Sequence, residues 1–279
     1  AVRSMMDGRK FGQAGARVVV EECMTGPEVT VLAFCDGEHL VPMPSSQDHK
    51  RAFDGNQGPN TGGMGAPSPN YTPEVARRCM EEIFLPTVAA LKAEGRPFQG
   101  VLYFGLMLTP DGPKVVEYNA RFGDPECQAV LSLLETDLLD IFLACRNGTL
   151  DRLNIRWKDG AACCLVLASG GYPGSYAKGL PITGLEDAGQ QAVVFHAGTK
   201  LGDDGTVFTN GGRVLGVRAG SERRDRQRLR RRGAHPLPGH ALPHRHWPGL
   251  KPLRPKGCYC WLSNWMLRLV ASIRAVLLR

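Results

Sequence analysis

The most informative stretch of this chain is KVVEYNARFGDPECQ, which spans residues 114–128. Glu117 and Asn119 stand two apart on a predicted strand, so both side chains leave the same face. A carboxylate and an amide oxygen on one face can act as two hard ligands for Mg²⁺, which fills its octahedron with water and phosphate oxygens. If the chain stays extended, Arg121 faces the same site and can bind phosphate. The alternative interpretation is the polar outer face of a hairpin.

The sequence on either side of this stretch predicts antiparallel strands. Short β-branched and apolar segments are bounded by turn residues, as is typical of a meander and a hairpin. The predicted strands are RVVVEE at 17–22, EVTVLAFC at 28–35, residues 39–43, GVLYFGLML at 100–108 and residues 113–119.

Two helices are predicted in the same part of the chain. Thr72 is a good N-cap, Pro73 suits the first helical position, and Gly95 ends this helix. The second helix is expected over residues 126–146, closed by the Asn-Gly pair at 147–148.

A second unit begins near Lys158. It contains a strand at 161–168 (AACCLVLA), a tight glycine-rich loop at 170–174 and a late strand at 213–217 (RVLGV). Loop segments at 196–199 and 210–213 are uninformative by themselves. The whole body is therefore expected to be α+β with mixed sheets.

Residues 45–70 are polar and glycine-rich without an apolar period, and they predict a long loop of the kind that is usually functional. Within it, GPNTGGMG at 58–65 brings backbone N–H groups where they can cradle a phosphate. A flexible loop is the alternative, because no G-K-[ST] follows as in a P-loop. The segment QDHKR at 47–51 concentrates polar donors and acceptors; its alternative is a solvated charge run.

Composition excludes several classes of protein. The chain has 279 residues, of which 43% are hydrophobic and 22% charged, close to the globular average, so a wholly disordered chain is excluded. The nine cysteines form no C-x-x-C pair, which favours free cysteines in a reducing cytosol over a zinc ribbon. Arg268 and Arg274 interrupt the best apolar stretch. We therefore expect a cytoplasmic protein without a membrane role.

The charge is divided unevenly along the chain. Residues 220–279 hold 14 Lys and Arg against two acidic residues, a net charge of +12, and 1–219 hold 20 basic and 25 acidic residues, a net charge of −5. The net charge of +7 thus describes neither part, and no specific nucleic-acid binding is predicted from it. The basic tail indicates either a shifted reading frame near residues 218–221 or an authentic disordered arm that binds RNA or anionic lipid nonspecifically.

Taken together, the motifs resemble one family, glycinamide ribonucleotide synthetase, also called phosphoribosylamine–glycine ligase. The resemblance covers about residues 1–219. Five stretches carry it in the family's order: VVVEE with Gly26 and Glu28, SQDHKR at 46–51, GPNTGGMGA at 58–66, KVVEYNARFGDPECQ at 114–128, and FHAGTKL with TNGGRVLGV between 195 and 217.

The resemblance implies an ATP-grasp fold, present in part over 1–157, then a small mixed α/β C-terminal domain over 158–219 and a tail over 220–279. It also implies ligation of glycine to 5-phosphoribosylamine with ATP and Mg²⁺ or Mn²⁺ in purine synthesis. The glycine carboxylate attacks the γ-phosphate of ATP, and the amine of phosphoribosylamine then displaces phosphate from the glycyl phosphate. Such a site mostly positions its reactants and neutralises charge.

The resemblance also assigns roles to residues. The metal ligands are Glu117 and Asn119, and the adenine-contacting strand end is Glu21, Glu22 and Cys23. Glu28 matches the ribose-binding acid, and Arg121, a catalytic candidate, lies at the phosphate end. Asp124 is a catalytic candidate that, like Glu126, could instead order its loop. The segments that would hold phosphoribosylamine are Asp48 with Lys50, and Asn60, Thr61, Gly62 and Gly63.

The chain departs from the family at both ends. Family members carry an N-terminal domain and early ATP-grasp strands before the region matched here, so this chain is expected to be inactive alone. Two alternatives remain open. One is another ATP-grasp carboxylate–amine ligase or carboxylase, and the other is a non-catalytic nucleic-acid-binding protein that acts through the basic tail.

Overall fold

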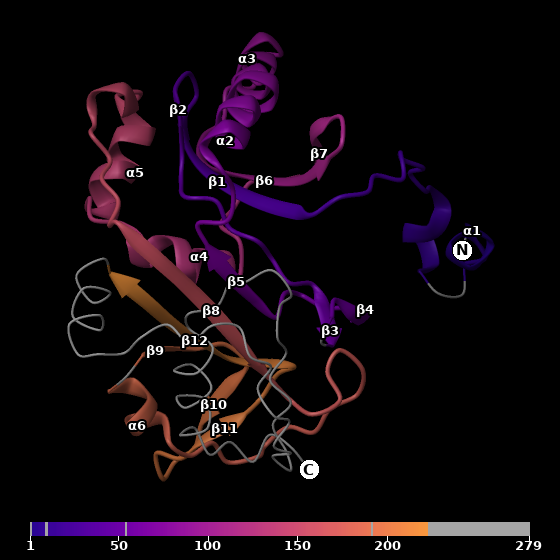
Figure 1. Cartoon of the computed structure of the whole chain (residues 1–279). Helices are drawn as coiled ribbons and strands as arrows, with labels where there is room; N and C mark the ends of the chain where they lie inside the picture. Colours follow the sequence, from indigo (N-terminus) through magenta and orange to yellow (C-terminus); the bar gives the residue numbers. More distant parts are fainter. Residues whose placement is uncertain (1, 9–10, 54, 191, 223–279) are drawn as a thin grey trace, which may run out of the picture.

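The computed structural model describes residues 2–8, 11–53, 55–190 and 192–222. For residues 220–222 it describes the backbone only. Two four-stranded sheets, each antiparallel throughout, form its body (Figure 1). The expected tail over 220–279 lies outside the described residues from 223 onward. In the part of the chain that is described, no helix has the length and apolarity needed to cross a bilayer.

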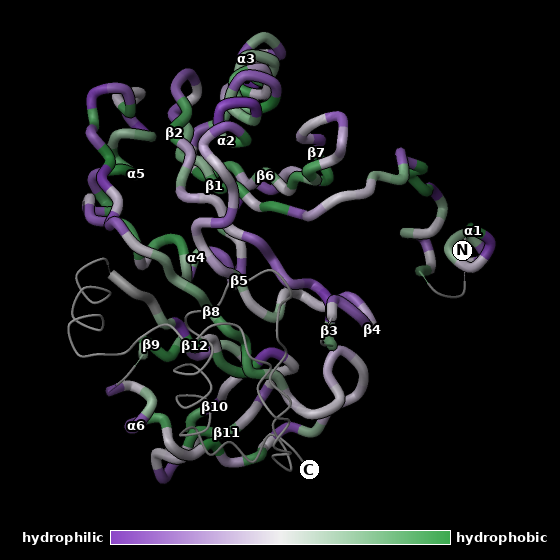
Figure 2. Tube along the Cα trace, in the orientation of Figure 1, coloured by the Kyte–Doolittle hydropathy of each residue, from purple (hydrophilic) through white to green (hydrophobic). Residues whose placement is uncertain are grey.

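The first sheet has the order β2-β1-β6-β7. Its strands are β1 (Glu28–Asp36), β2 (Leu40–Pro42), β6 (Gln99–Thr109) and β7 (Gly112–Asn119). The meander from β1 to β2 and the hairpin of β6 and β7 confirm the strands predicted at 28–35, 39–43, 100–108 and 113–119. Figure 2 shows hydrophobic residues concentrated along β6 and, in the second sheet, along β8 (Gly160–Ala168).

Helices cover both faces of the first sheet. On one face lie α2 (Pro73–Cys79), a π-helical turn η2 (Met80–Phe84) and α3 (Leu85–Ala93), which bury Phe84 against Phe104. The predicted cap is present, since the Thr72 hydroxyl accepts from the Val75 N–H at 3.4 Å. On the other face lie α4 (Glu126–Val130), η3 (Leu131–Leu133), α5 (Leu138–Asn147) and η4 (Leu150–Arg152).

The second sheet has the order β5-β8-β12-β9 and joins distant parts of the sequence. Its central strands, β8 and β12 (Arg213–Glu222), confirm the strands predicted at 161–168 and 213–217, and its edges are β5 (Gly65–Ser68) and β9 (Val193–His196). Because β5 follows directly on the glycine-rich loop, that loop is fixed to the second sheet at one end.

Short elements complete the fold. Two ribbons are formed by β3 (Arg51–Phe53) with β4 (Gln57–Asn60) and by β10 (Thr199–Leu201) with β11 (Val207–Thr209). Helix α6 (Leu185–Gly189) packs beside β9. The first two elements, α1 (Val2–Met6) and η1 (Gly12–Ala16), stand apart from the two sheets in Figure 1.

The strand predicted at 17–22 is wrong. This segment is irregular, and Val19 and Val20 are 84% and 85% exposed. An isolated extended segment has no ladder hydrogen bonds, and the described residues provide no neighbouring strand for it. Strand propensity without a partner therefore produced no strand.

Two further predictions need correction. The helix expected over 126–146 breaks at 134–137, because Leu134 pairs with Trp157 and Asp137 caps a new helix by accepting from the Leu139 N–H at 2.8 Å. The long loop expected at 45–70 contains β3, β4 and β5. Its glycine-rich part is thus held between a ribbon and a sheet, which a search for apolar periodicity could not detect.

Asp36 fixes the end of β1 in the first sheet. Its carboxylate accepts hydrogen bonds from the backbone N–H groups of Glu38 at 3.0 Å, His39 at 2.7 Å and Leu150 at 3.1 Å, and its Oδ2 lies 3.1 Å from Nδ1 of His39. Although only 4% exposed, this aspartate is fully partnered. It joins the β1–β2 turn to η4, a contact that was not predicted from the sequence.

Candidate functional site

A lysine joins the two strands that were expected to bind nucleotide and metal. The Nζ of Lys50 lies 3.4 Å from a carboxylate oxygen of Glu28 and 3.5 Å from one of Glu117. Burial by itself would lower the pKa of Lys50, but Glu28 and Glu117, with Asp48, raise it overall, so the ammonium stays charged. These three predicted site residues therefore come together as one cluster.

The strand register explains this meeting. Thr30 of β1 and Glu117 of β7 both pair with Gly105 of β6, so Glu28 and Glu117 leave the sheet on the same face. Gly105 leaves room there, since a Cβ would lie 2.8 Å from the Glu117 side chain.

Asn119 and Arg121 lie at the end of the same face. Asn119 pairs with Tyr103 across β6, and the guanidinium of Arg121 lies 6.0 Å from the centre of the Tyr103 ring. Arg121 lies two residues beyond the end of β7 and donates to the carbonyl of Phe122 at 2.7 Å. The expected extended path thus ends at Asn119, and Arg121 reaches this face through its side chain.

Glu117 and Asn119 provide a carboxylate oxygen and an amide oxygen, the hard donor set that a divalent ion such as Mg²⁺ prefers. Glu117 remains 45% exposed, so its carboxylate is accessible from outside despite the contact with Lys50. These two residues therefore fit a metal that retains water and phosphate ligands. They are the residues that would hold it.

Two further acidic residues act on the same region, and one of them is fully buried. Glu126, at the start of α4, is only 2% exposed and accepts a hydrogen bond from the Thr30 hydroxyl at 3.3 Å. Asp48 is its acidic neighbour, and its Oδ1 is buried and accepts no hydrogen bond from the described residues. Burial first, and then Glu126, raise the pKa of Asp48 to about 7.

The glycine-rich loop is shaped by contacts at both ends. Thr61 donates to the carbonyl of Lys50 from its N–H at 2.7 Å and from its hydroxyl at 2.8 Å. Gly62 donates its N–H to the Tyr172 hydroxyl at 2.9 Å, which ties the loop to the second unit. Asn60, by contrast, is exposed at the end of β4, opposite Arg51. The structure thus brings Thr61 and Gly62 into the site more closely than Asn60.

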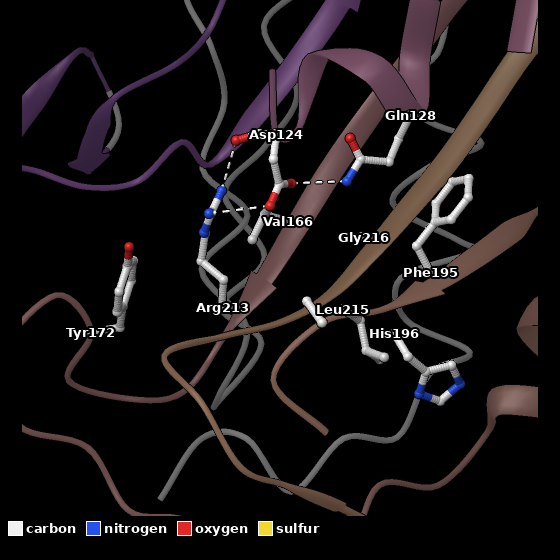
Figure 3. Close-up of a pocket in the computed structure, with 10 residues that line it drawn as sticks. Asp124, Gln128, Val166, Tyr172, Phe195, His196, Arg213, Leu215 and Gly216 are labelled. Carbon is white, nitrogen blue, oxygen red and sulfur yellow. Dashed lines mark hydrogen bonds and ion pairs between the residues drawn. The ribbon is translucent and has the colours of Figure 1, made fainter. Parts of the chain in front are cut away.

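Arg213 holds this loop against the segment that precedes α4. From the start of β12 it donates to the carbonyl of Gly62 at 2.7 Å, to the carbonyl of Asp124 at 2.8 Å and to the Asp124 carboxylate at 3.2 Å. The other carboxylate oxygen of Asp124 accepts from Gln128 at 2.8 Å (Figure 3). This arrangement favours an ordering role for Asp124, because both of its oxygens have partners.

A pocket of about 360 Å³ lies beside this contact, between α4 and the second sheet (Figure 3). Asp124, Gln128 and Arg213 form its polar wall, and Phe195 and Leu215 belong to its apolar lining. No role for Arg213, Tyr172 or Gln128 was predicted from the sequence. The only available signal was the Asn-Gly-Gly-Arg motif at 210–213, which alone does not show what the arginine contacts.

The predicted adenine-contacting segment is the least enclosed part of the site. Glu22 pairs with Lys114 of β7 at 2.6 Å, and Cys23 is exposed. Glu21 is exposed as well. One ion pair thus connects this segment to β7 of the first sheet, and Glu21 and Cys23 remain exposed to solvent.

Comparison with known proteins identifies two family domains in the chain. A family model described as the ATP-grasp (A) domain of phosphoribosylglycinamide synthetase matches residues 1–127, and one described as the C domain of the same enzyme matches residues 162–228.

Curated relatives match most of this chain but only part of their own length. The phosphoribosylamine–glycine ligase of Halalkalibacterium halodurans is 51% identical over 77% of this chain and 50% of its own. The trifunctional purine biosynthetic protein adenosine-3 of Gallus gallus is 52% identical over 78% of this chain and 22% of its own. The chain thus spans about half the length of the bacterial relative.

A solved structure shares the fold. The phosphoribosylamine–glycine ligase of Thermotoga maritima has a TM-score of 0.69 and 32% identity, with 83% of this chain and 59% of that chain covered. The two sheets thus represent part of an ATP-grasp domain followed by a small α/β C-terminal domain. The chain belongs to the phosphoribosylglycinamide synthetase family, that of the phosphoribosylamine–glycine ligases.

Proposed function

We propose that this chain supplies the metal- and acceptor-binding half of a phosphoribosylamine–glycine ligase. The reaction joins glycine to 5-phosphoribosylamine and gives glycinamide ribonucleotide, ADP and phosphate, with glycyl phosphate as the intermediate. The observation that carries the proposal is the matched order of both family domains along the chain, at about 50% identity to named ligases. The proposed place of the reaction is purine biosynthesis.

The residues divide into three groups under this proposal. ATP would contact Glu21, Glu22 and Cys23 with its adenine, Glu28 with its ribose and Arg121 with its phosphates. Mg²⁺ or Mn²⁺ would be held by Glu117 and Asn119 and, when bound, would neutralise charge on the phosphates. Phosphoribosylamine would lie against Asp48, Lys50 and the loop of Asn60, Thr61, Gly62 and Gly63.

The pocket beside Arg213 supports the third group. It adjoins the glycine-rich loop through the contact of Arg213 with Gly62, and its volume falls near the lower end of the usual range for small-ligand sites. We propose that it receives the phosphoribosyl part of the acceptor. Arg213 would then hold the loop and Asp124 in place while the ligand binds.

The test is glycine-dependent ADP formation by the chain fused behind the part of the H. halodurans ligase that it does not cover. We expect ADP only when glycine and freshly generated phosphoribosylamine are both present, and we expect the chain alone to be inactive. Glu117→Gln should lower the rate by 10²-fold or more, on the order of one lost electrostatic contact to the reacting phosphates. Asp204→Asn, in an exposed turn, is the matched control.

ADP formation that does not depend on glycine would contradict the proposal and favour a different ATP-grasp enzyme. Full activity of the chain without the added region would contradict the expected division of the site.

A further inference from the structure

One lysine contacts two carboxylates that have separate roles in the proposed site. The ammonium of Lys50 lies 3.4 Å from an oxygen of Glu28, the proposed ribose-binding acid, and 3.5 Å from Oε1 of Glu117, the proposed metal ligand. The side chains of Glu28 and Glu117 are 42% and 45% exposed, and that of Lys50 is 29% exposed. An ion that approaches Glu117 from solvent therefore meets the ammonium of Lys50 as well.

The main chain of Lys50 is held independently of its side chain. The carbonyl of Lys50 accepts hydrogen bonds from the N–H of Thr61 at 2.7 Å and from the hydroxyl of Thr61 at 2.8 Å. These bonds do not depend on which side chain stands at position 50. The flexible stem of a lysine can carry its ammonium from one acceptor to another while the backbone stays in place.

The ammonium and a divalent cation compete for the same carboxylate. An ion bound to the Glu117 carboxylate would lie closer to the ammonium than the electrostatic screening length of about 8 Å at physiological salt, so the two positive charges repel. A single and a double charge a few ångströms apart in water change a binding equilibrium by about 10-fold. Glu28 offers the displaced ammonium a second carboxylate, so Lys50 can leave Glu117 without any change in the loop.

Arg121 brings a second positive charge to the same face of the sheet. Its guanidinium lies 6.0 Å from the centre of the Tyr103 ring. The positive charges of Lys50 and Arg121 thus weaken the attraction that Glu28 and Glu117 have for a bare divalent ion. Phosphate oxygens reverse this balance, because they bind lysine and arginine side chains and also complete the coordination of a metal such as Mg²⁺.

Resting on the proposed function, we propose that Lys50 competes with the divalent metal for Glu117, so that the site accepts the metal together with phosphate groups and not by itself. Lys50 is then a positioning residue for the metal. It holds Glu28 and Glu117 together until the phosphates arrive, and it then leaves Glu117 for Glu28 or for a phosphate oxygen. This role goes beyond the contact with phosphoribosylamine proposed above.

The test measures Mn²⁺ binding by the whole chain in the absence of nucleotide. Electron paramagnetic resonance reports the free Mn²⁺, and circular dichroism checks that each variant is folded. We expect Lys50→Met to bind Mn²⁺ about 10-fold more tightly than the unsubstituted chain, because it keeps the apolar stem and removes the charge. Lys50→Gln should show the same gain, and Lys50→Arg, which keeps the charge, should not. Lys200→Met removes an exposed lysine on β10 and is the matched control, with an unchanged affinity.

Two further measurements connect this gain to Glu117 and to charge. Adding Glu117→Gln to Lys50→Met should abolish the gain, because the carboxylate released by Lys50 is then missing. Raising the NaCl concentration should reduce the gain, because salt screens the repulsion between the ammonium and the metal. A gain that did not change with salt would show that the substitution acts by reshaping the site, and it would overturn the proposal.

The outcomes separate this proposal from the proposed function. If Lys50→Met bound Mn²⁺ with the affinity of the unsubstituted chain, or more weakly, the competition would be overturned, and Glu117 and Asn119 would remain the proposed metal ligands. If neither protein bound Mn²⁺, or if the added Glu117→Gln left the binding unchanged, Glu117 would not be a metal ligand. That result would overturn the metal site of the proposed function, and the competition with it.

Discussion

Asp36 and Asp48 are two aspartates in contrasting surroundings. Asp36 ends β1 and receives three backbone N–H donors and the His39 ring, whereas Oδ1 of Asp48 receives no donor from the described residues. Burial raises the pKa of both, but the donors around Asp36 outweigh burial and hold its pKa below the usual value. The pKa of Asp48 stays raised, at about 7. Burial alone therefore does not decide the charge of a carboxylate; the donors around it do.

The largest effect is expected from Asp36→Ala. It removes the acceptor of the buried Leu150 N–H and of the part-buried Glu38 and His39 N–H groups. A buried donor left unpaired costs about 1–3 kcal/mol and each part-buried hydrogen bond contributes about 0.5–1.5 kcal/mol, so we expect a loss of about 2–6 kcal/mol. Urea unfolding followed by circular dichroism at pH 7 measures it. Asp151→Ala, an exposed aspartate in η4, is the matched control. A loss below 1 kcal/mol would show that water replaces the carboxylate.

Asp48→Asn should have the opposite effect on stability. Because the folded-state pKa of about 7 lies above the unfolded value near 4, the carboxylate weakens the fold once it ionises, and stability decreases as the pH rises from about 4 to about 7. Above pH 7 we expect the variant to be more stable by about 2–4 kcal/mol. Urea titrations between pH 4 and 8 measure this difference. If the stability of the variant decreased with pH as steeply as that of the unsubstituted chain, the raised pKa of Asp48 would be refuted.

Arg213→Lys tests the contacts that hold the glycine-rich loop next to Asp48. A lysine keeps the charge that favours ionised Asp48 but cannot make the forked contacts to Gly62 and Asp124, so we expect a loss of about 1–2 kcal/mol. Hydrogen exchange of the Gly62 and Gly63 amides should become faster at the same time. Lys200→Arg, a charge-conserving change on β10 away from the loop, is the control, and equal exchange in all three proteins would contradict the role of Arg213.

His39→Gln should have the smallest effect. The hydrogen bond to Asp36 raises the pKa of His39, so its contribution to stability is present at low pH and is lost as the pH rises through that folded-state pKa. We expect the variant to match the unsubstituted chain at pH 8 and to be slightly less stable at pH 5.5. His196→Gln, whose ring bonds Thr199 in its own loop, serves as the control. A stability difference between the variant and the unsubstituted chain that grows with pH would contradict a raised pKa of His39.

The sequence predicted those elements whose partners lie nearby in the chain. The hairpin of β6 and β7 and the strand β1 were predicted within a residue or two, because apolar runs and turn residues act locally. The segment at 17–22 has the same composition but found no neighbour among the described residues, so its propensity was not sufficient.

The site shows the same division. The spacing of Glu117 and Asn119 placed them on one face, and the motif at 58–65 indicated a functional loop. The contact of Lys50 with Glu28 and Glu117 and the reach of Arg213 to Gly62 were not predictable, since both depend on which sheets pack together.

Local sequence therefore determined the longer strands of the two sheets and the family to which the protein belongs, because apolar runs and short motifs are properties of neighbouring residues. The tertiary structure decided which charges have partners. Asp36 and Asp48 are the same residue type in the same part of the chain, and no pattern in the sequence separates them. Only packing brings the N–H of Leu150 to Asp36, and only packing places Glu126 and the bare backbone of Gly63 beside Asp48. The strength of an electrostatic interaction depends on distance and burial, and both are set by the fold.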